Sequence, residues 1–296
     1  MPPAHPRSSR EGSATRGAFD KALRSRSLIK GPTRRAPPRR RAPHRISTWL
    51  AKTATPILKA AADLFLPKVC VACTRLLPPT DTGLICTLCW SRLAYLPHPQ
   101  CHRCGHPNPR GKSCHWCQLL PPYIRSVRSV CWTPHPTTSP TLYALKYAQW
   151  PKTAAEIAAR MARLPWPQDV LTERALLIPV PLAKPRLRER GFNQSALLAE
   201  HLATHWHIPT LDALTRTRAT PTQTRLTPTD RLRNVAGAFA TSVPKTSLAG
   251  KHVVLVDDVV TTAATLNACA ATLLEGGARI ISYVTFGRAR AAGDRL

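Results

Sequence analysis

Residues 253 to 266 read VVLVDDVVTTAATL and place two adjacent carboxylates between an apolar run and a threonine-rich turn. Asp257 and Asp258 directly follow Val253 to Val256, which are apolar enough to form a buried strand of a parallel sheet. Ligands of open α/β sheets bind at the edge where the carboxyl ends of the strands meet. We therefore expect both carboxylates to point into a crevice and to accept hydrogen bonds from sugar hydroxyls.

Three threonines, Thr261, Thr262 and Thr265, bracket the predicted start of a helix over residues 265–277, which ends in two glycines. The first turn of a helix has unpaired backbone N–H groups and the positive end of the dipole, so it suits a phosphate, and hydroxyls add donors. Acids for sugar hydroxyls and a helix start for phosphate describe a site for a phosphorylated ribose. The purely structural alternative is that Asp258 caps the helix and the threonines fill a turn.

Eight of the ten cysteines stand in four C-x-x-C pairs, a pattern that predicts two structural metal sites. The pairs are Cys70 with Cys73, Cys86 with Cys89, Cys101 with Cys104, and Cys114 with Cys117. One such turn places two thiolates about 2.3 Å from a tetrahedral zinc ion, and two turns complete a closed shell. We expect the pairs to combine sequentially, first with second and third with fourth; an interleaved cross-brace is the alternative.

Other metal-ligating residue types near these pairs are weaker candidates. His102, His106 and His115 could each replace a cysteine, but with eight thiols in register we interpret them as surface histidines. Cys131 and Cys269 lie outside the pattern, and we interpret both as small buried apolar residues.

The composition of the 296-residue chain, with 43% hydrophobic residues, suits one ordinary domain and a smaller module. Its formal net charge of +28 favours polyanionic partners, either nucleic acid or phosphorylated metabolites. Because no apolar run resembles a membrane-spanning helix or a signal peptide, we expect a cytoplasmic protein whose thiols stay reduced.

The chain divides into four segments by composition. Residues 1–45 are rich in proline and arginine and predict a disordered basic arm, either an inert leader or a nucleic-acid-binding tail. Residues 46–66 predict a lead-in helix, interrupted at Pro56. Residues 67–122 form the cysteine-paired module, and residues 127–296 form an α/β domain.

Within the α/β domain, apolar runs alternate with helical periodicity. Buried strands are predicted at residues 175–182, 252–259 and 278–289. Helices are predicted at residues 141–150, 154–164, 195–206 and 265–277. A strand, a crossover helix and a strand within about 35 residues predict a parallel sheet flanked by helices.

The stretch VVLVDDVVTTAAT resembles the phosphoribosyl pyrophosphate (PRPP) signature of type I phosphoribosyltransferases, with Ala263 where that family usually has glycine. IPVPLAKPRLRERGFNQSALLAEHLA (residues 178–203), LYALKY (142–147) and residues 214–239 are similar to the ComF family, which joins a zinc module to a phosphoribosyltransferase-like domain. The resemblance covers about residues 65–290 and implies a type I phosphoribosyltransferase fold.

This resemblance also implies a role for each matching position. Asp257 and Asp258 would bind the ribose hydroxyls and take part in catalysis. The phosphate loop consists of Thr261, Thr262, Ala263, Ala264 and Thr265. A basic loop that approaches pyrophosphate consists of Lys184, Arg186, Arg188 and Arg190. A mobile lid over residues 216–238 contributes Arg216, Arg218, Arg225, Arg231 and Arg233. Magnesium would accompany PRPP, and zinc would be structural.

Two classes of function follow. The first is an enzyme of nucleoside metabolism that transfers phosphoribose from PRPP with release of pyrophosphate, its acceptor left open. The second is a single-stranded-DNA-binding accessory protein with a catalytically inactive phosphoribosyltransferase fold, since ComF relatives are associated with DNA uptake and natural transformation. DNA-uptake or recombination proteins are then expected partners. A zinc-ribbon regulator is a third, weaker interpretation because no helix-turn-helix is visible.

Overall fold

The structure, a computed structural model, describes residues 67–78, 80–81, 83–108, 114–147, 151–218 and 237–290. The arm and lead-in helix expected before residue 67 lie outside these residues. Among the helices that the structure describes, none is long and apolar enough to cross a membrane.

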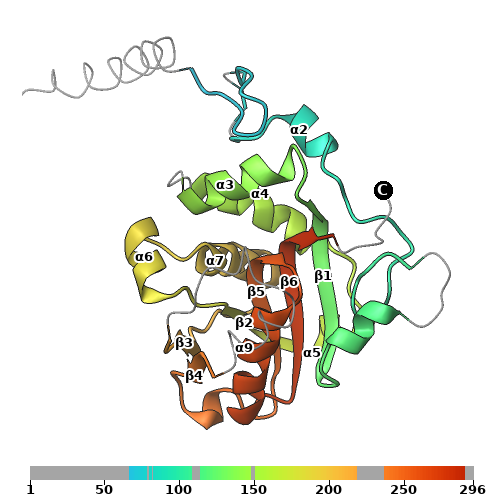
Figure 1. The fold of residues 1–296 in the computed structure, drawn as a ribbon, viewed down its shortest axis with the longest axis vertical. Helices are drawn as coiled ribbons and strands as arrows, with labels where there is room; N and C mark the ends of the chain where they lie inside the picture. The colour runs from blue at the N-terminus through green and yellow to red at the C-terminus, as the bar shows by residue number, and fades with distance from the viewer. Residues whose placement is uncertain are drawn as a thin grey trace, which may run out of the picture. The chain divides into compact units, whose positions relative to one another are not determined.

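Four parallel strands form the central sheet (Figure 1). In spatial order they are β1 (Ile124–Thr133), β6 (Ile280–Ala289), β5 (His252–Val260) and β2 (Arg174–Pro179). Strands β5 and β6 are paired from His252 with Ile280 to Val260 with Arg288. Their near-continuous apolar sequences reflect a sheet that is buried on both faces, as the sequence pattern predicts.

Helices cover both faces of this sheet. On one face α3 (Thr138–Tyr147), α4 (Pro151–Ala162) and α7 (Gln194–Trp206) share a hydrophobic core with Val254 and Val256 of β5. On the other face α9 (Ala264–Glu275) packs with Val253 and Leu255. Successive apolar residues of β5 therefore point to opposite faces of the sheet and contact different helices.

Shorter elements complete the described chain. They are α2 (Thr87–Ser91), a 3₁₀ helix (His115–Leu119), α5 (Gln168–Glu173), α6 (Lys184–Arg190), a 3₁₀ helix (Lys245–Ser247), and the antiparallel pair β3 (Leu214–Arg216) and β4 (Phe239–Thr241).

Two sequence-based expectations about the sheet need correction. The first strand, β1, was not predicted because Arg125 and Arg128 interrupt its apolar run, yet Arg128 is only 5% exposed. Its guanidinium is satisfied by the carbonyl oxygens of His102, Val127 and Pro165. The second is small: β5 continues one residue beyond the predicted range 252–259, to Val260, and both aspartates lie within the strand.

Candidate functional site

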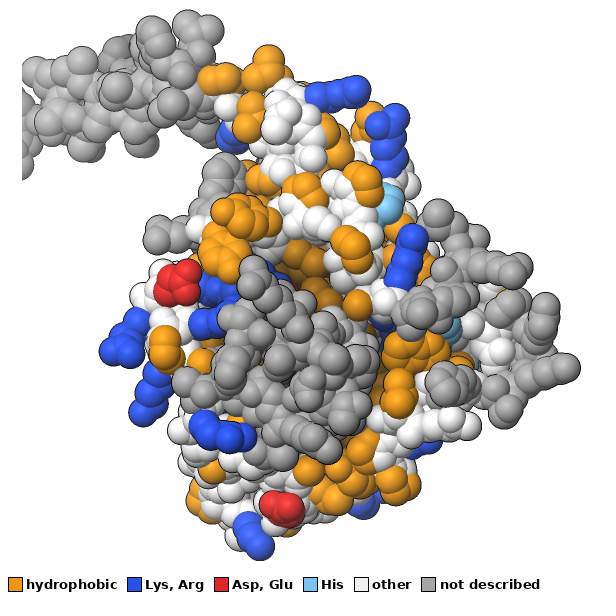
Figure 2. Space-filling view, in the orientation of Figure 1, with side chains coloured by type: hydrophobic (Ala, Val, Ile, Leu, Met, Phe, Trp, Pro, Cys, Tyr) orange, Lys and Arg blue, Asp and Glu red, His pale blue; other side chains and the backbone are white. Residues whose placement is uncertain are grey.

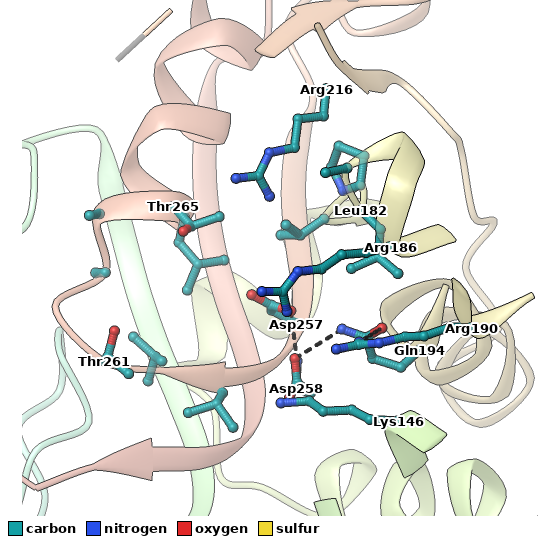
Figure 3. A pocket seen from close by; sticks show the side chains of 18 residues that line it. Lys146, Leu182, Arg186, Arg190, Gln194, Arg216, Asp257, Asp258, Thr261 and Thr265 are labelled. Atoms are coloured by element: carbon teal, nitrogen blue, oxygen red, sulfur yellow. Dashed lines mark hydrogen bonds and ion pairs between the residues drawn. The ribbon is translucent and has the colours of Figure 1, made fainter. Parts of the chain in front are cut away.

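A cavity of about 260 Å³ lies at the carboxyl ends of β2 and β5, the edge at which parallel sheets bind ligands. Figure 3 shows the carboxylates of Asp257 and Asp258 at its base, with Arg186 and Arg190 reaching toward them from α6. The segment with Thr261 lies on the opposite side of the same cavity. The structure thus brings the acids, part of the basic segment and the threonine turn together.

Asp258 is held in a buried network of polar groups. Its Oδ2 lies 2.5 Å from Nζ of Lys146, at the end of α3, and its Oδ1 accepts a hydrogen bond from Nε2 of Gln194 (3.2 Å). Burial alone would raise the pKa of Asp258, but the Lys146 ammonium, together with hydrogen bonds to Asp257 and Gln194, holds the pKa below its usual value. Asp258 is therefore held as an ion-paired carboxylate, and it does not cap α9, whose N-cap is Ala263.

Asp257 titrates differently from its neighbour. Its Oδ1 accepts hydrogen bonds from Oγ of Ser195 (2.9 Å) and from the backbone N of Asp258 (2.9 Å). Burial, followed by the negative charge of Asp258, raises the pKa of Asp257 to about 8. Protonation of Asp257 is therefore favoured relative to an exposed aspartate.

The expected basic loop is a helix, α6. Pro185 lies in its first turn and Gly191 ends it with a φ of 77°, and both residue types favour these positions. A helix turns its side chains to different sides, so only Arg186 and Arg190 of the four basic residues line the cavity. The other two, Lys184 and Arg188, are exposed.

Arg190 is buried between the cavity and α3. Its Nη1 donates to Oε1 of Gln194 (2.9 Å), and its Nη2 donates to the hydroxyl of Tyr147 (3.3 Å). Its guanidinium carbon lies 4.9 Å from the centre of the Tyr147 ring. Arg190 therefore positions Gln194 against Asp258 in addition to supplying positive charge to the cavity.

The threonine turn forms a tight loop before α9. Ala263 has a φ of 59° and is the N-cap of the helix without a side-chain cap, so the departure from glycine falls on a left-handed position. An alanine there costs about 1 kcal/mol relative to glycine. Thr261, Ala263, Ala264 and Thr265 line the cavity, whereas Thr262 faces a separate small cavity behind the loop.

Only the first part of the expected lid is described. Arg216, at the end of β3, lines the cavity, and Arg218 is exposed and does not line it. The remaining predicted lid residues, Arg225, Arg231 and Arg233, lie outside the described residues.

Three residues that hold the aspartates were not predicted from the sequence, namely Lys146, Gln194 and Ser195. The available signal for Lys146 is a lone cation in the otherwise apolar sequence LYALKY. Gln194 and Ser195 follow Asn193, whose side chain accepts a hydrogen bond from the backbone N of Ser195 and so begins α7. This cap places the first turn of α7 against β5.

The eight paired cysteines form two separate groups. One consists of Cys70, Cys73, Cys86 and Cys89, and the other of Cys101, Cys104, Cys114 and Cys117; within each, the Sγ atoms lie within 4.8 Å of one another. Four thiolates at this spacing fit a tetrahedral zinc ion. The sequential pairing is confirmed and the cross-brace is wrong. His106 is in neither group and stacks on Trp116, with ring centres 5.2 Å apart.

Two segments of the chain match known domain families. Residues 61–118 match the double zinc ribbon domain, and residues 193–295 match the phosphoribosyl transferase domain. The first match covers both cysteine groups and supports structural zinc, and the second covers both aspartates and the loop that follows them. The parallel sheet, its flanking helices and the preceding zinc module agree with the fold predicted from sequence.

Relatives extend over most of the chain. It is 36% identical to the DNA utilization protein YhgH of Escherichia coli O6:H1 over 228 residues, 74% of this chain and 96% of that protein. It is 31% identical to competence protein ComFC of Bacillus subtilis over 199 residues, 65% of this chain and 79% of the other. With competence protein F of Haemophilus influenzae it shares 40% identity over 116 residues, 39% of this chain and 50% of that protein.

Among solved structures, glutamine PRPP amidotransferase from Bacillus subtilis, complexed with ADP and GMP, is 19% identical and aligns with a TM-score of 0.32. The alignment covers 47% of this chain and 29% of that one. An alignment at this TM-score does not establish a shared fold, whereas the sheet order and the domain match do.

Proposed function

Since this chain belongs to the ComF family, together with its YhgH and ComFC relatives, we propose that it binds PRPP with Mg²⁺ and acts in DNA utilisation or uptake. The observation that carries the proposal is a single cavity lined by Asp257 and Asp258, by the loop at the start of α9, and by Arg186 and Arg216. Carboxylates, backbone N–H groups and guanidinium groups are the groups that recognise a ribose, a phosphate and a pyrophosphate.

Each part of PRPP then has a partner in the cavity. The ribose hydroxyls donate to Asp257 and Asp258, and the 5′-phosphate accepts from the backbone N–H groups at the start of α9 and from Thr261 and Thr265. The pyrophosphate lies against Arg186. Magnesium binds through one or two carboxylates and substrate phosphates, and when bound it neutralises the pyrophosphate, so the donor set fits it. Such binding is the first step of phosphoribosyl transfer to an acceptor.

Thermal unfolding with and without ligand tests this proposal. PRPP with Mg²⁺ at 100 times its Kd stabilises a single-site protein by about 2.7 kcal/mol. We expect this shift in the unmodified chain and its loss in Asp257→Asn combined with Asp258→Asn. An equal shift in both proteins would show that PRPP binds elsewhere.

The raised pKa of Asp257 adds a pH dependence to the same test. If PRPP and Mg²⁺ require the Asp257 carboxylate, binding releases its proton, so affinity rises as pH rises toward 8. The gain in affinity is at most about tenfold per pH unit. It should be measured above about pH 6.5, because a phosphate group itself titrates near pH 6. Asp257→Asn alone should flatten this profile.

A second candidate function, binding of single-stranded DNA, is favoured by an exposed aromatic pair on α3. Tyr143 and Tyr147 are 65% and 45% exposed, one turn apart on α3, with ring centres 4.9 Å apart. Arg190 joins Tyr147 to the cavity. In Figure 2 blue Lys and Arg side chains adjoin orange hydrophobic ones on the face shown. Bases stack on exposed aromatic rings while basic groups follow the strand.

Tyr143→Ala tests this candidate. We expect about a 5- to 160-fold loss of affinity for an oligothymidylate, because one stacked base contributes about 1–3 kcal/mol. An abasic strand of equal length and charge should bind both proteins alike, and Tyr143→Phe should retain the affinity. Fluorescence anisotropy at fixed salt measures the affinity of the unmodified chain and of both variants for each strand. Equal losses for the two strands would exclude stacking on Tyr143.

A further inference from the structure

The second cysteine group contacts the sheet through residues 101–108 and 114–120, which we call the second knuckle. The Arg103 guanidinium donates hydrogen bonds to carbonyl oxygens at the junction between the second knuckle and β1, those of Cys117, Leu120, Pro121 and Ile124. Gly105 has a φ of 67°, and a side chain there would collide with the carbonyl oxygen of Val127. The second knuckle is thus closely fitted to β1.

The second knuckle also forms the wall behind the phosphate loop. A cavity of only about 10 Å³ lies between Cys104, Trp116 and Leu119 on one side and Thr262 and Ala263 on the other. This space leaves no room for a layer of solvent. The Thr262 hydroxyl is buried there and has no hydrogen-bond partner among the described residues. The loop is therefore held from behind by packing.

Two hydrogen bonds join the second knuckle to the elements around the loop. Nδ2 of Asn267, in the first turn of α9, donates to the carbonyl oxygen of Leu119 (3.0 Å). Asn267 is itself oriented by the Tyr283 hydroxyl of β6, which donates to its Oδ1 (3.0 Å). From the end of β6, Nη2 of Arg288 donates to the carbonyl oxygen of Cys104 (2.5 Å). The helix start that would face a phosphate is thus attached to the metal-binding segment.

The first cysteine group contacts a different part of the domain. The backbone N of Leu84 and Nε1 of Trp90 donate to the Glu156 carboxylate on α4, at 2.7 and 3.1 Å. The guanidinium of Arg160 lies 3.2 Å from the centre of a Trp90 ring. No residue of this group lines the ligand cavity or the small cavity behind the loop.

We propose that the zinc site of the second knuckle holds the phosphate loop in its binding conformation, whereas the first zinc site, whose segment contacts α4, does not act on this loop. Ala263 is in a left-handed conformation that an alanine rarely adopts, so this loop depends on its surroundings. Four thiolates on one ion fix the backbone of the second knuckle, and through Leu119 and Cys104 they fix the start of α9 and the end of β6. An effect of the second zinc on PRPP affinity rests on the proposed function, whereas its effect on the conformation of the loop does not.

Matched pairs of cysteine variants in the full chain test this division. Cys114→Ser with Cys117→Ser removes the second zinc, and Cys86→Ser with Cys89→Ser removes the first; zinc analysis should find one ion fewer in each. Hydrogen exchange of residues 259–266 is measured without ligand. We expect exchange about tenfold faster in the second-site variant and unchanged exchange in the first-site variant. Equal exchange in the two variants would overturn the proposal.

Asn267→Ala provides a test that leaves every cysteine in place, should the second-site variant fail to fold. It removes the hydrogen bond to Leu119 and should also speed exchange of the loop, whereas Tyr283→Phe removes only the other bond of Asn267 and should not. An unchanged loop in Asn267→Ala would contradict the proposal. If the loop responds as expected but no variant or parent binds PRPP, the proposed function fails and the role of the second zinc stands.

Discussion

Replacing Lys146 with alanine will lower the free energy of unfolding by about 3–5 kcal/mol, because it leaves a buried carboxylate without its cation. The side chain of Asp258 is 8% exposed and that of Lys146 is 26% exposed, so water compensates little for the lost ammonium. The pair also joins the end of α3 to β5. Urea denaturation at pH 7, where Asp258 is ionised, measures the loss.

A second substitution separates the unpaired charge from lost packing. Lys146→Ala combined with Asp258→Asn removes both charges and should recover a large part of the stability lost in Lys146→Ala. Lys146→Arg keeps the charge and should cost less than alanine. A loss below about 1 kcal/mol in Lys146→Ala would mean that the pair is solvated like a surface ion pair.

Replacing Arg186 with alanine will weaken PRPP binding about 10- to 100-fold, whereas Arg188→Ala will change it less than about twofold. The two arginines lie on the same short helix, but Arg186 lines the cavity and Arg188 is exposed. A hydrogen bond to a charged group contributes about 1.5–3 kcal/mol, which corresponds to the expected loss for Arg186.

Arg188→Ala serves as the control because it removes the same charge from the same element, so any general effect of net charge on a polyanion appears in both variants. Calorimetric titration of each with PRPP and Mg²⁺ gives the comparison. Similar losses in the two variants would mean that α6 acts only through its overall charge and that Arg186 does not contact the ligand.

The sequence predicts much of this fold because its signals are local. Val253 to Val256, the two aspartates and the helix from Thr265 follow one another within a single strand–helix unit, so short-range pattern is enough to place them. The cysteine pairs are equally local, since each C-x-x-C turn brings its own two thiols together. The left-handed position of Ala263 could be anticipated because the family resemblance places glycine there.

Other features depend on contacts between distant segments and were missed. Lys146 is 112 residues from Asp258 in sequence, and only the packing of α3 against the sheet brings them together. Strand β1 was missed because Arg128 finds its carbonyl partners in the zinc module and beyond α4, which no local pattern shows. The position of the second knuckle behind Thr262 is likewise a product of tertiary packing.

Calorimetric titration of PRPP into the zinc-loaded chain at pH 8, with and without Mg²⁺, tests the central claim most directly. We predict one PRPP bound per chain with micromolar affinity in the presence of Mg²⁺, and much weaker binding without it. No heat at two temperatures, in protein that carries two zinc ions per chain, would contradict PRPP binding and would leave single-stranded DNA as the ligand to pursue.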